Sequence, residues 1–240
     1  MKALVFAAGL GTRLKPLTDT MPKALVPVGG VPMLQIVLEK LRGAGYDEVI
    51  INVHHFADQI VDFVKAHDGF GMNILFSDET DLLRETGGGI RHAARLLKDT
   101  DEPVLVHNVD IISNLDLKWF RSCHRPGDLA TILVSKRKTA RYFLFDEESR
   151  LTGWTNIETG IVRSPYGNID TDSCTPLAFA GIHLISPEIF SLMEEWPEKF
   201  PIVDFYLSVC RQHTIRGVEA DNLQMKDLGK ITDFQDIKIQ

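Results

Sequence analysis

Apolar residues follow two different periodicities in the first half of the chain. Compact apolar runs at residues 2–8 and 48–53 are typical of strands buried on both faces of a parallel sheet. The segment 32–42 instead places leucine and valine at helical spacing, after a proline and before a glycine. This alternation predicts a parallel α/β layer with right-handed crossovers. We expect strands at 2–8, 48–53, 73–76 and 104–106 and helices at 32–42, 58–66 and 87–97.

The second half of the chain has a different pattern. Short apolar segments separated by turns or polar stretches predict antiparallel strands. A turn-rich stretch at 159–174 is expected to be a loop, and the tail after Asp227 a short terminal helix. The whole pattern predicts an α/β fold: a Rossmann-like mixed, mainly parallel sheet flanked by helices, with a small antiparallel extension, in one domain spanning 1–240. The elements expected here are strands at 129–134, 142–145, 151–154 and 176–185 and a helix at 202–212.

Composition narrows the classes of protein that fit. With 240 residues, of which 44% are apolar, the chain can form one large core, and its longest apolar runs are far shorter than the ~20 residues of a membrane span. No leader pattern precedes the first strand, so we expect a cytoplasmic protein. The three widely spaced cysteines fit neither a disulfide framework nor a zinc site and are expected to be buried reduced thiols.

Charge is distributed unevenly along the chain. The net charge is −7, which argues against a nucleic-acid partner. Residues 1–30 nevertheless carry four cations and a single acid, Asp19. A small basic island in an acidic chain suggests a local anionic ligand rather than a polyanion.

The first predicted strand leads into a glycine-containing loop with basic residues. Gly9 and Gly11 permit tight curvature and expose backbone N–H groups to phosphate oxygens. Arg13 offers a planar fork for two oxygens, and Lys23 adds a compact charge. The dinucleotide motif fails because Leu14 stands where its third glycine belongs, and no P-loop motif exists. The loop therefore predicts a polyphosphate site, against the alternative of an ordinary strand-to-helix turn with surface cations.

Residues 9–33, GLGTRLKPLTDTMPKALVPVGGVPM, resemble the signature of sugar-1-phosphate nucleotidylyltransferases. The segments LRETGGGI and FAGI are most similar to N-acetylmuramic acid 1-phosphate uridylyltransferases and to small mannose-1-phosphate guanylyltransferase-like proteins. The resemblance implies the nucleotide-diphospho-sugar transferase fold, with a nucleotide-binding half at 1–110 and a sugar-phosphate-binding half at 111–240. It also implies a Mg²⁺-dependent transfer from a nucleoside triphosphate to a sugar 1-phosphate, with no nucleic-acid or membrane partner.

The resemblance assigns roles to individual residues. It places Arg13 on the leaving phosphates and Lys23 at the α-phosphate, as catalytic residues. Three consecutive glycines at a helix start are poor for helix propensity, so we expect close approach of a flat ligand there, with a flexible loop as the alternative. The positions implied to bind the nucleotide are Ala8, Gly9, Gly11, Thr12, Glu79, Glu85, Gly88 and Asn108.

Two aspartates are the expected metal ligands. Asp110 follows a parallel strand, at the edge where α/β sheets bind ligands, although an isolated acid there is often only a turn residue. The resemblance makes it a Mg²⁺ ligand and adds Asp227 from the segment KDLG. Mg²⁺ suits one or two carboxylates together with substrate phosphates. The sugar phosphate would bring its own anionic nucleophile, so positioning and charge neutralisation would suffice for catalysis.

The sugar-facing residues are less defined. The region that carries a lysine in many family members has none here, and Phe179 replaces an asparagine before Gly181. Arg141, Tyr142 and Gly181 are the expected sugar-binding residues, with a structural role at strand ends as the alternative. The sugar, the choice between uracil and guanine, and the oligomeric state stay open. Two other functions also stay open: phosphocholine cytidylyltransferase, and a non-catalytic nucleotide-sugar sensor with the same fold.

Overall fold

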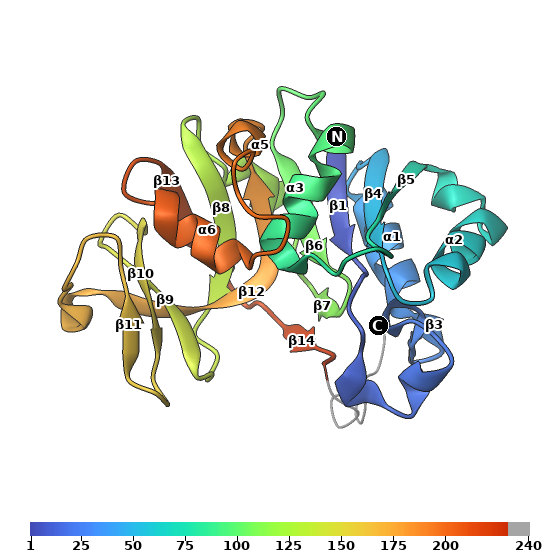
Figure 1. The fold of residues 1–240 in the computed structure, drawn as a ribbon, viewed down its shortest axis with the longest axis horizontal. Helices are drawn as coiled ribbons and strands as arrows, with labels where there is room; N and C mark the ends of the chain where they lie inside the picture. Colours follow the sequence, from blue (N-terminus) through green and yellow to red (C-terminus); the bar gives the residue numbers. More distant parts are fainter. Residues whose placement is uncertain (230–240) are drawn as a thin grey trace.

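The computed structural model describes residues 1–229. Ten strands of this part of the chain form one mixed sheet (Figure 1). The amino-terminal part of this sheet is parallel, in the order β5-β4-β1-β6. Because helices cover both of its faces, these strands are apolar almost throughout, as the sequence predicted. Their bounds are β1 Lys2–Phe6, β4 Glu48–Val53, β5 Asn73–Asp78 and β6 Val104–Asn108.

Strand β12 links this layer to an antiparallel extension. It pairs with β6 at one end and with β9 at the other, while β8 pairs with both β12 and β13. Its register shifts between Phe179 and His183, and Gly181 adopts a φ of +73° inside this bulge, which allows the strand to bend. The bounds are β8 Asp128–Ser135, β9 Arg141–Phe145, β10 Leu151–Asn156, β11 Ile161–Arg163, β12 Thr175–Ile185 and β13 Thr214–Glu219.

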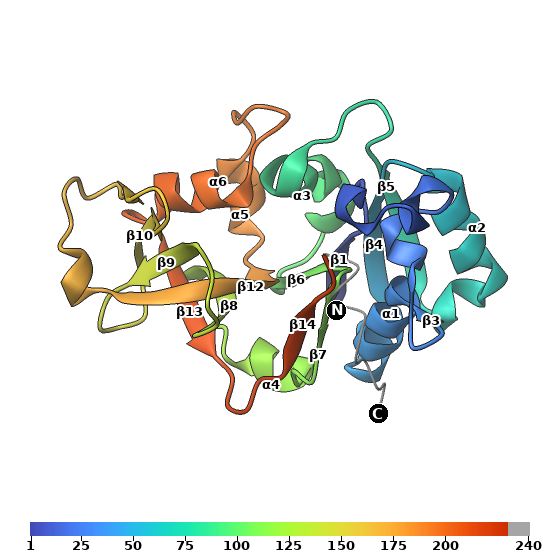
Figure 2. The same cartoon turned by 90° about the horizontal axis from the view of Figure 1, so that it is seen from below.

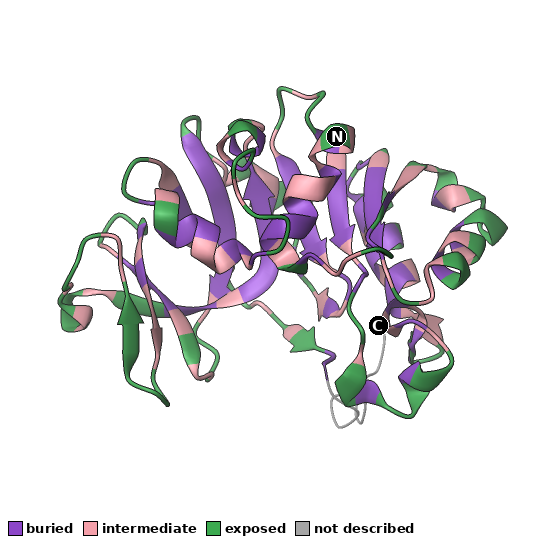
Figure 3. Cartoon of the chain, in the orientation of Figure 1, coloured by how far each residue is buried: buried purple, intermediate pink, exposed green. Residues whose placement is uncertain are grey.

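Helices lie on both sides of the sheet (Figure 2). Alternate residues of β1 show the two faces: Ala3 and Val5 pack into the cluster that includes α1, α2 and α4, whereas Leu4 packs into the cluster that includes α3, α5 and α6. The interior of the sheet is buried, and exposure increases towards β11 and the outer helices (Figure 3). The helices are α1 Met33–Gly43, α2 Ala57–Ala66, α3 Glu85–Leu97, α4 Leu117–Ser122, α5 Glu188–Leu192 and α6 Ile202–Val209.

Two small ribbons complete the described part of the chain. Strands β2 (Pro27–Val28) and β3 (Val31–Pro32) form a hairpin that leads into α1. Strands β7 (Ile111–Ser113) and β14 (Met225–Asp227) pair in antiparallel fashion. The second ribbon matters for the site, because it joins the segment after β6 to the end of the described chain.

The structure confirms the predicted fold class and corrects several local expectations. The stretch 159–174 is not entirely loop, because it contains β11 and a 3₁₀ turn at Thr171–Ser173. The helix expected at 202–212 ends at Val209, and α4, α5 and β13 were not predicted. The terminal helix expected after Asp227 falls mainly on residues 230–240, which lie outside the described residues. The assignment of one domain stays a prediction.

Two expectations from composition also have outcomes. Among the described residues, no helix combines the length and apolar character needed to cross a bilayer. The three cysteines are all unpaired, but only Cys210 is buried, while Cys123 and Cys174 are half-buried. The expectation of three buried thiols was therefore wrong for two of them.

Candidate active site

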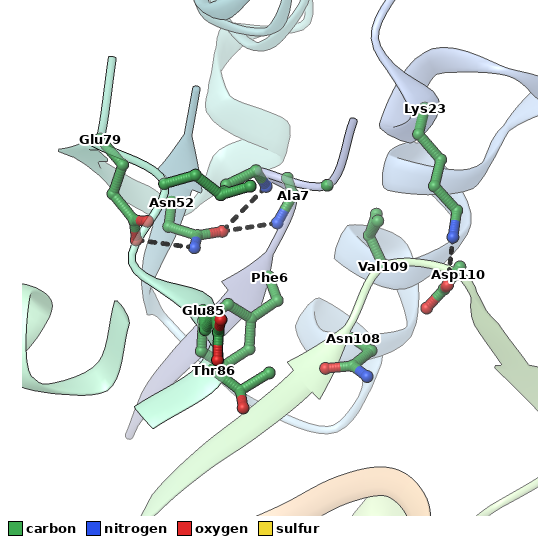
Figure 4. Close-up of a pocket in the computed structure, with 13 residues that line it drawn as sticks. Phe6, Ala7, Lys23, Asn52, Glu79, Glu85, Thr86, Asn108, Val109 and Asp110 are labelled. Carbon is green, nitrogen blue, oxygen red and sulfur yellow. Dashed lines mark hydrogen bonds and ion pairs between the residues drawn. The ribbon is translucent and has the colours of Figure 1, made fainter. Parts of the chain in front are cut away.

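A cavity of about 250 Å³ opens where the carboxyl ends of β1, β4, β5 and β6 meet. Ligands of open α/β sheets bind outside the carboxyl ends of the strands, so the location favours a binding site. Figure 4 shows the side chains that converge on it. The cavity is lined by Phe6, Ala7, Ala8, Gly9, Lys23, Asn52, Glu79, Leu83, Glu85, Thr86, Asn108, Val109 and Asp110.

The loop after β1 is held in a tight curve by its own residues. Gly11 has a φ of +64°, and its carbonyl accepts hydrogen bonds from the Leu14 amide at 2.8 Å and the Thr18 hydroxyl at 2.9 Å. A Cβ at Gly11 would lie 2.8 Å from Cγ2 of Thr18, so only glycine fits. Leu14 is fully buried and anchors the turn, which leaves Arg13 on the exposed side. Thr12 begins the same 3₁₀ turn and is also exposed.

Asn52 fixes the beginning of this loop. Its side-chain oxygen accepts hydrogen bonds from the backbone N–H of Ala7 at 2.6 Å and of Ala8 at 3.1 Å. The Ala8 amide is therefore engaged by protein, although Ala8 and Gly9 both line the cavity. A Cβ at Gly9 would meet nothing within 4 Å, so the space around this residue is open. Sequence analysis missed Asn52, although a polar residue inside the apolar strand 48–53 was a usable signal.

The two aspartates expected to bind metal lie next to each other. Asp227 is opposite Ile111 in the β7–β14 ribbon, and the Leu228 amide donates to the Asp110 carbonyl at 2.9 Å. The Asp110 carboxylate also forms an ion pair with the ammonium of Lys23 (Figure 4). Strand pairing thus brings together residues that are more than 100 positions apart in the sequence.

The electrostatics of this cluster agree with its geometry. Burial raises the pKa of Asp227, and the neighbouring Asp110 carboxylate raises it further, while Lys23, Arg137 and Arg13 lower it. Arg13 is also close by distance, because a Cβ at Gly229 would lie 2.9 Å from its Nη2 and 3.1 Å from the Asp227 carboxylate. Adjacent carboxylates supply the oxygen ligands that a hard divalent cation takes together with phosphate oxygens.

A two-carboxylate set limits which metals fit. The described residues contain no group of three or more His, Cys, Asp and Glu side chains that could hold a metal ion. Asp110 and Asp227 alone suit a hard cation such as Mg²⁺, which keeps several waters and takes further oxygens from phosphates. A structural zinc site would need four protein ligands, which the described residues do not provide.

The start of α3 gives two of its three glycines a role in packing. Glu85, with a φ of +61°, and Thr86 line the cavity, but Gly88 does not. A Cβ at Gly88 would lie 2.2 Å from the Glu198 carbonyl oxygen, and one at Gly87 would lie 2.3 Å from the Phe200 ring. The lack of side chains at Gly87 and Gly88 therefore makes room for the segment before α6, and the nucleotide-binding role of Gly88 stays a prediction. The Gly87 and Gly88 amides both donate to the Phe200 carbonyl, which ties this segment to the helix start.

The expected sugar-side residues are more dispersed. Gly181 lies against Asn108, because a Cβ there would be 2.9 Å from the Asn108 Nδ2. Arg141 and Tyr142 lie on β9 and do not line the cavity, and the Tyr142 hydroxyl accepts a hydrogen bond from the Thr139 amide. Arg137 was missed, since nothing in the sequence distinguishes it from the lysines on either side.

Comparison with known proteins identifies the family. Residues 2–143 match the family described as "Nucleotidyl transferase", and the chain belongs to this family. It is 30% identical to the N-acetylmuramate alpha-1-phosphate uridylyltransferase of Caulobacter vibrioides, over 93% of this chain and 90% of that protein. It is also 30% identical to the mannose-1-phosphate guanyltransferase of Aspergillus oryzae, over 98% of this chain but only 62% of that protein.

A solved structure supports the same fold. The crystal structure of HddC from Yersinia pseudotuberculosis complexed with GMP-PN superposes with a TM-score of 0.76. The match covers 97% of this chain and 96% of that chain at 21% sequence identity. The family match and the 30% identity to the uridylyltransferase show that the chain is a nucleotidyltransferase, so the expected family and enzyme class are confirmed.

Proposed function

We propose that the protein transfers a nucleotidyl group from a nucleoside triphosphate to a sugar 1-phosphate, releasing pyrophosphate. The observation that carries this proposal is the convergence of Asp110, Asp227, Lys23 and Arg13 beside a cavity at the carboxyl ends of parallel strands. The names of the curated relatives support the same reaction class.

The residues divide the work of the reaction. The open backbone around Gly9 and the curved turn at Gly11 receive the phosphates. Arg13, exposed at the tip of this turn, offsets the charge that builds on the departing pyrophosphate. Lys23 lies at the cavity edge beside Asp110 and contacts the α-phosphate, the group under attack.

Asp110 and Asp227 would hold a divalent cation, for which we propose Mg²⁺. When bound, this cation neutralises phosphate charge and orients the attacking and leaving oxygens. A sugar 1-phosphate is an anion that needs no general base, so binding and alignment account for the chemistry. Arg137 is the cation we assign to the sugar phosphate. Its charge lowers the pKa of Asp227, and its guanidinium donates a hydrogen bond to the Phe179 carbonyl of the antiparallel strand β12 at 3.2 Å.

The favoured substrates are UTP and N-acetylmuramic acid 1-phosphate. The chain covers 90% of the curated uridylyltransferase, whereas it spans less than two thirds of the fungal guanyltransferase. GTP with mannose 1-phosphate is the second candidate, because the identity to both relatives is 30%. We place the protein in the cytoplasm, a location with which its unpaired cysteines are consistent.

Pyrophosphate release tests the proposal. The purified protein is incubated with Mg²⁺, each of the four common triphosphates and a panel of sugar 1-phosphates, with phosphocholine plus CTP as a separate arm. We expect release with one triphosphate and one sugar 1-phosphate, and none with Asp110→Asn. Release only with phosphocholine would identify the cytidylyltransferase alternative. Tight binding of a nucleotide sugar without any turnover would identify the sensor alternative.

A further inference from the structure

Two polar side chains are fully buried beneath the loop that follows β1, residues 7–23, which we call the phosphate loop. Asn52, the fifth residue of β4, is 1% exposed, and Glu79, just after β5, is 0% exposed. Burying an amide and a carboxyl group in a strand layer is costly unless both are fully hydrogen-bonded. Each nitrogen and oxygen of the two side chains has at least one hydrogen-bond partner.

Asn52 and Glu79 form a continuous chain of hydrogen bonds (Figure 4). The Asn52 oxygen accepts from the Ala7 and Ala8 amides, and its Nδ2 donates to the Glu79 Oε1 at 2.9 Å. The Glu79 Oε2 accepts from the Arg84 amide at 3.1 Å. These hydrogen bonds thus connect the start of the phosphate loop to the segment that carries Glu85 and Thr86 into the cavity.

Helix α3 packs directly on this pair. A Cβ at Gly89 would lie 3.0 Å from the Glu79 Oε1 and 3.4 Å from the Asn52 Nδ2. A side chain at position 89 would therefore crowd the pair, and glycine lets the helix pack against it. Each carboxylate oxygen of Glu79 accepts a hydrogen bond from a protein group, an arrangement that suits a residue holding neighbouring side chains and backbone in place.

We propose that Asn52 and Glu79 are positioning residues that lock the phosphate loop and the 83–86 segment into one nucleotide site. Asn52 uses the Ala7 and Ala8 amides to set the direction in which the chain leaves β1, so that the amides from Gly9 onward face the triphosphate. Glu79 accepts from the Asn52 Nδ2, which fixes the orientation of the Asn52 amide group, and it also accepts from the Arg84 backbone N–H. It makes no contact with the base. This inference rests on the proposed nucleotide site.

An isosteric exchange of polarity tests the pair. In Asn52→Asp two carboxylates face each other, and in Glu79→Gln an amide N–H₂ group faces a donor. In the double variant Asn52→Asp/Glu79→Gln, the glutamine donates to the aspartate and still accepts from Arg84, so every hydrogen bond returns. Each single variant should lower kcat/KM for the triphosphate by about 10-fold or more, because a buried group loses its partner. The double variant should recover most of that loss.

The opposite end of the same two strands supplies a matched control. Asn73 on β5 donates to Glu48 on β4 at 3.5 Å, and Asn73 is exposed. Asn73→Asp repeats the change on the same strand pair away from the cavity, and it should leave the KM for the triphosphate unchanged. In the variants of Asn52 and Glu79, the KM for the sugar 1-phosphate should change less than the KM for the triphosphate.

Three readouts separate this inference from its alternatives. The order of preference among the four triphosphates should stay the same in every variant; a new order in Glu79→Gln alone, without rescue in the double variant, would show a base-reading role and overturn the inference. The melting-temperature shift caused by the triphosphate measures the nucleotide site even if no sugar 1-phosphate is turned over. If a single variant does not fold, the double variant decides, since it should bind the triphosphate as the wild type does, and weak binding by a folded double variant would contradict the proposal.

Discussion

The ammonium of Lys23 forms an ion pair with the carboxylate of Asp110, joining the end of the phosphate loop to the end of β6. Both side chains are largely buried, at 11% and 18% exposure, so the attraction is weakly screened by solvent. The pair ties one proposed catalytic cation to one proposed metal ligand. A divalent cation at Asp110 must therefore compete with Lys23 for the same carboxylate.

This competition predicts opposite effects of one substitution. Lys23→Met keeps the apolar stem but removes the charge, so the free protein should bind Mn²⁺ more tightly than the wild type does. Turnover should fall by about 100-fold or more, because the charge at the α-phosphate is lost. Titration calorimetry with Mn²⁺ and steady-state kinetics measure the two effects. Weaker Mn²⁺ binding in this variant would mean that Lys23 and the metal do not share Asp110.

Asp227 should contribute to metal binding at the expense of the stability of the free protein. Its pKa is raised by burial and by the Asp110 carboxylate, so Asp227→Asn removes an unfavourable charge. We expect the metal-free variant to melt at or above the wild-type temperature, and to lose the stabilisation that Mg²⁺ and triphosphate give the wild type. A variant that melts much lower without metal, yet retains the ligand-induced shift, would contradict the assignment.

Arg13 should be needed for turnover and dispensable for folding. Arg13→Ala should lower kcat by about 100- to 1,000-fold, the usual cost of losing one contact to developing charge. Its melting temperature should stay that of the wild type, because the side chain is exposed. Lys15→Ala is the matched control, since Lys15 lies in the same loop and pairs with Asp19 at 3.1 Å. Equal losses in the two variants would indicate a general charge effect.

Two buried histidines predict a loss of stability in mild acid. Burial lowers the pKa of His107 to about 4 and that of His183 to about 3, from an ordinary value of 6.5. The unfolded chain therefore binds more protons below pH 6.5, and the free energy of unfolding should drop as the pH falls. Between pH 7 and 5 the two together should remove about 4 kcal/mol. Urea unfolding at both pH values measures this, and His183→Gln should remove about half of the dependence. Equal stability at the two pH values would refute it.

The glycines at the start of α3 should be required for folding rather than for binding. Gly88→Ala would place a methyl group 2.2 Å from the Glu198 carbonyl oxygen, and we expect it to cost at least about 1–3 kcal/mol of stability. Gly9→Ala is the comparison, because its methyl group would meet nothing within 4 Å of the protein. That variant should fold normally and lose affinity for the triphosphate. Chemical denaturation and nucleotide titration separate the two effects.

The sequence was sufficient for the elements that depend on local periodicity. Buried parallel strands and amphipathic helices such as α1 were predicted, because continuous apolar runs and helical spacing are properties of the segment itself. Strand β11 was missed because its three residues are all exposed, so burial leaves no pattern in them. The packing role of Gly87 and Gly88 was missed because the groups that fill the space, Phe200 and Glu198, are more than 100 positions away.

The same division applies to the site. Lys23, Asp110 and Asp227 were predicted together, and the structure brings them together. Asn52 could have been noticed as a polar residue in an apolar strand, but its two amide partners follow from the pairing of β1 with β4. Arg137 follows β8 and donates to the Phe179 carbonyl of β12, a contact that depends on strand pairing and leaves no signal in the local sequence.

Following the α-phosphate of the triphosphate tests the central claim most directly. UTP and GTP labelled at the α-phosphorus are incubated with the protein, Mg²⁺ and the preferred sugar 1-phosphate. The account predicts that the label appears in a nucleotide sugar, in equal amount to unlabelled pyrophosphate, and that Asp110→Asn and Asp227→Asn abolish both products. Label recovered as free nucleoside monophosphate, or full activity in either aspartate variant, would contradict it.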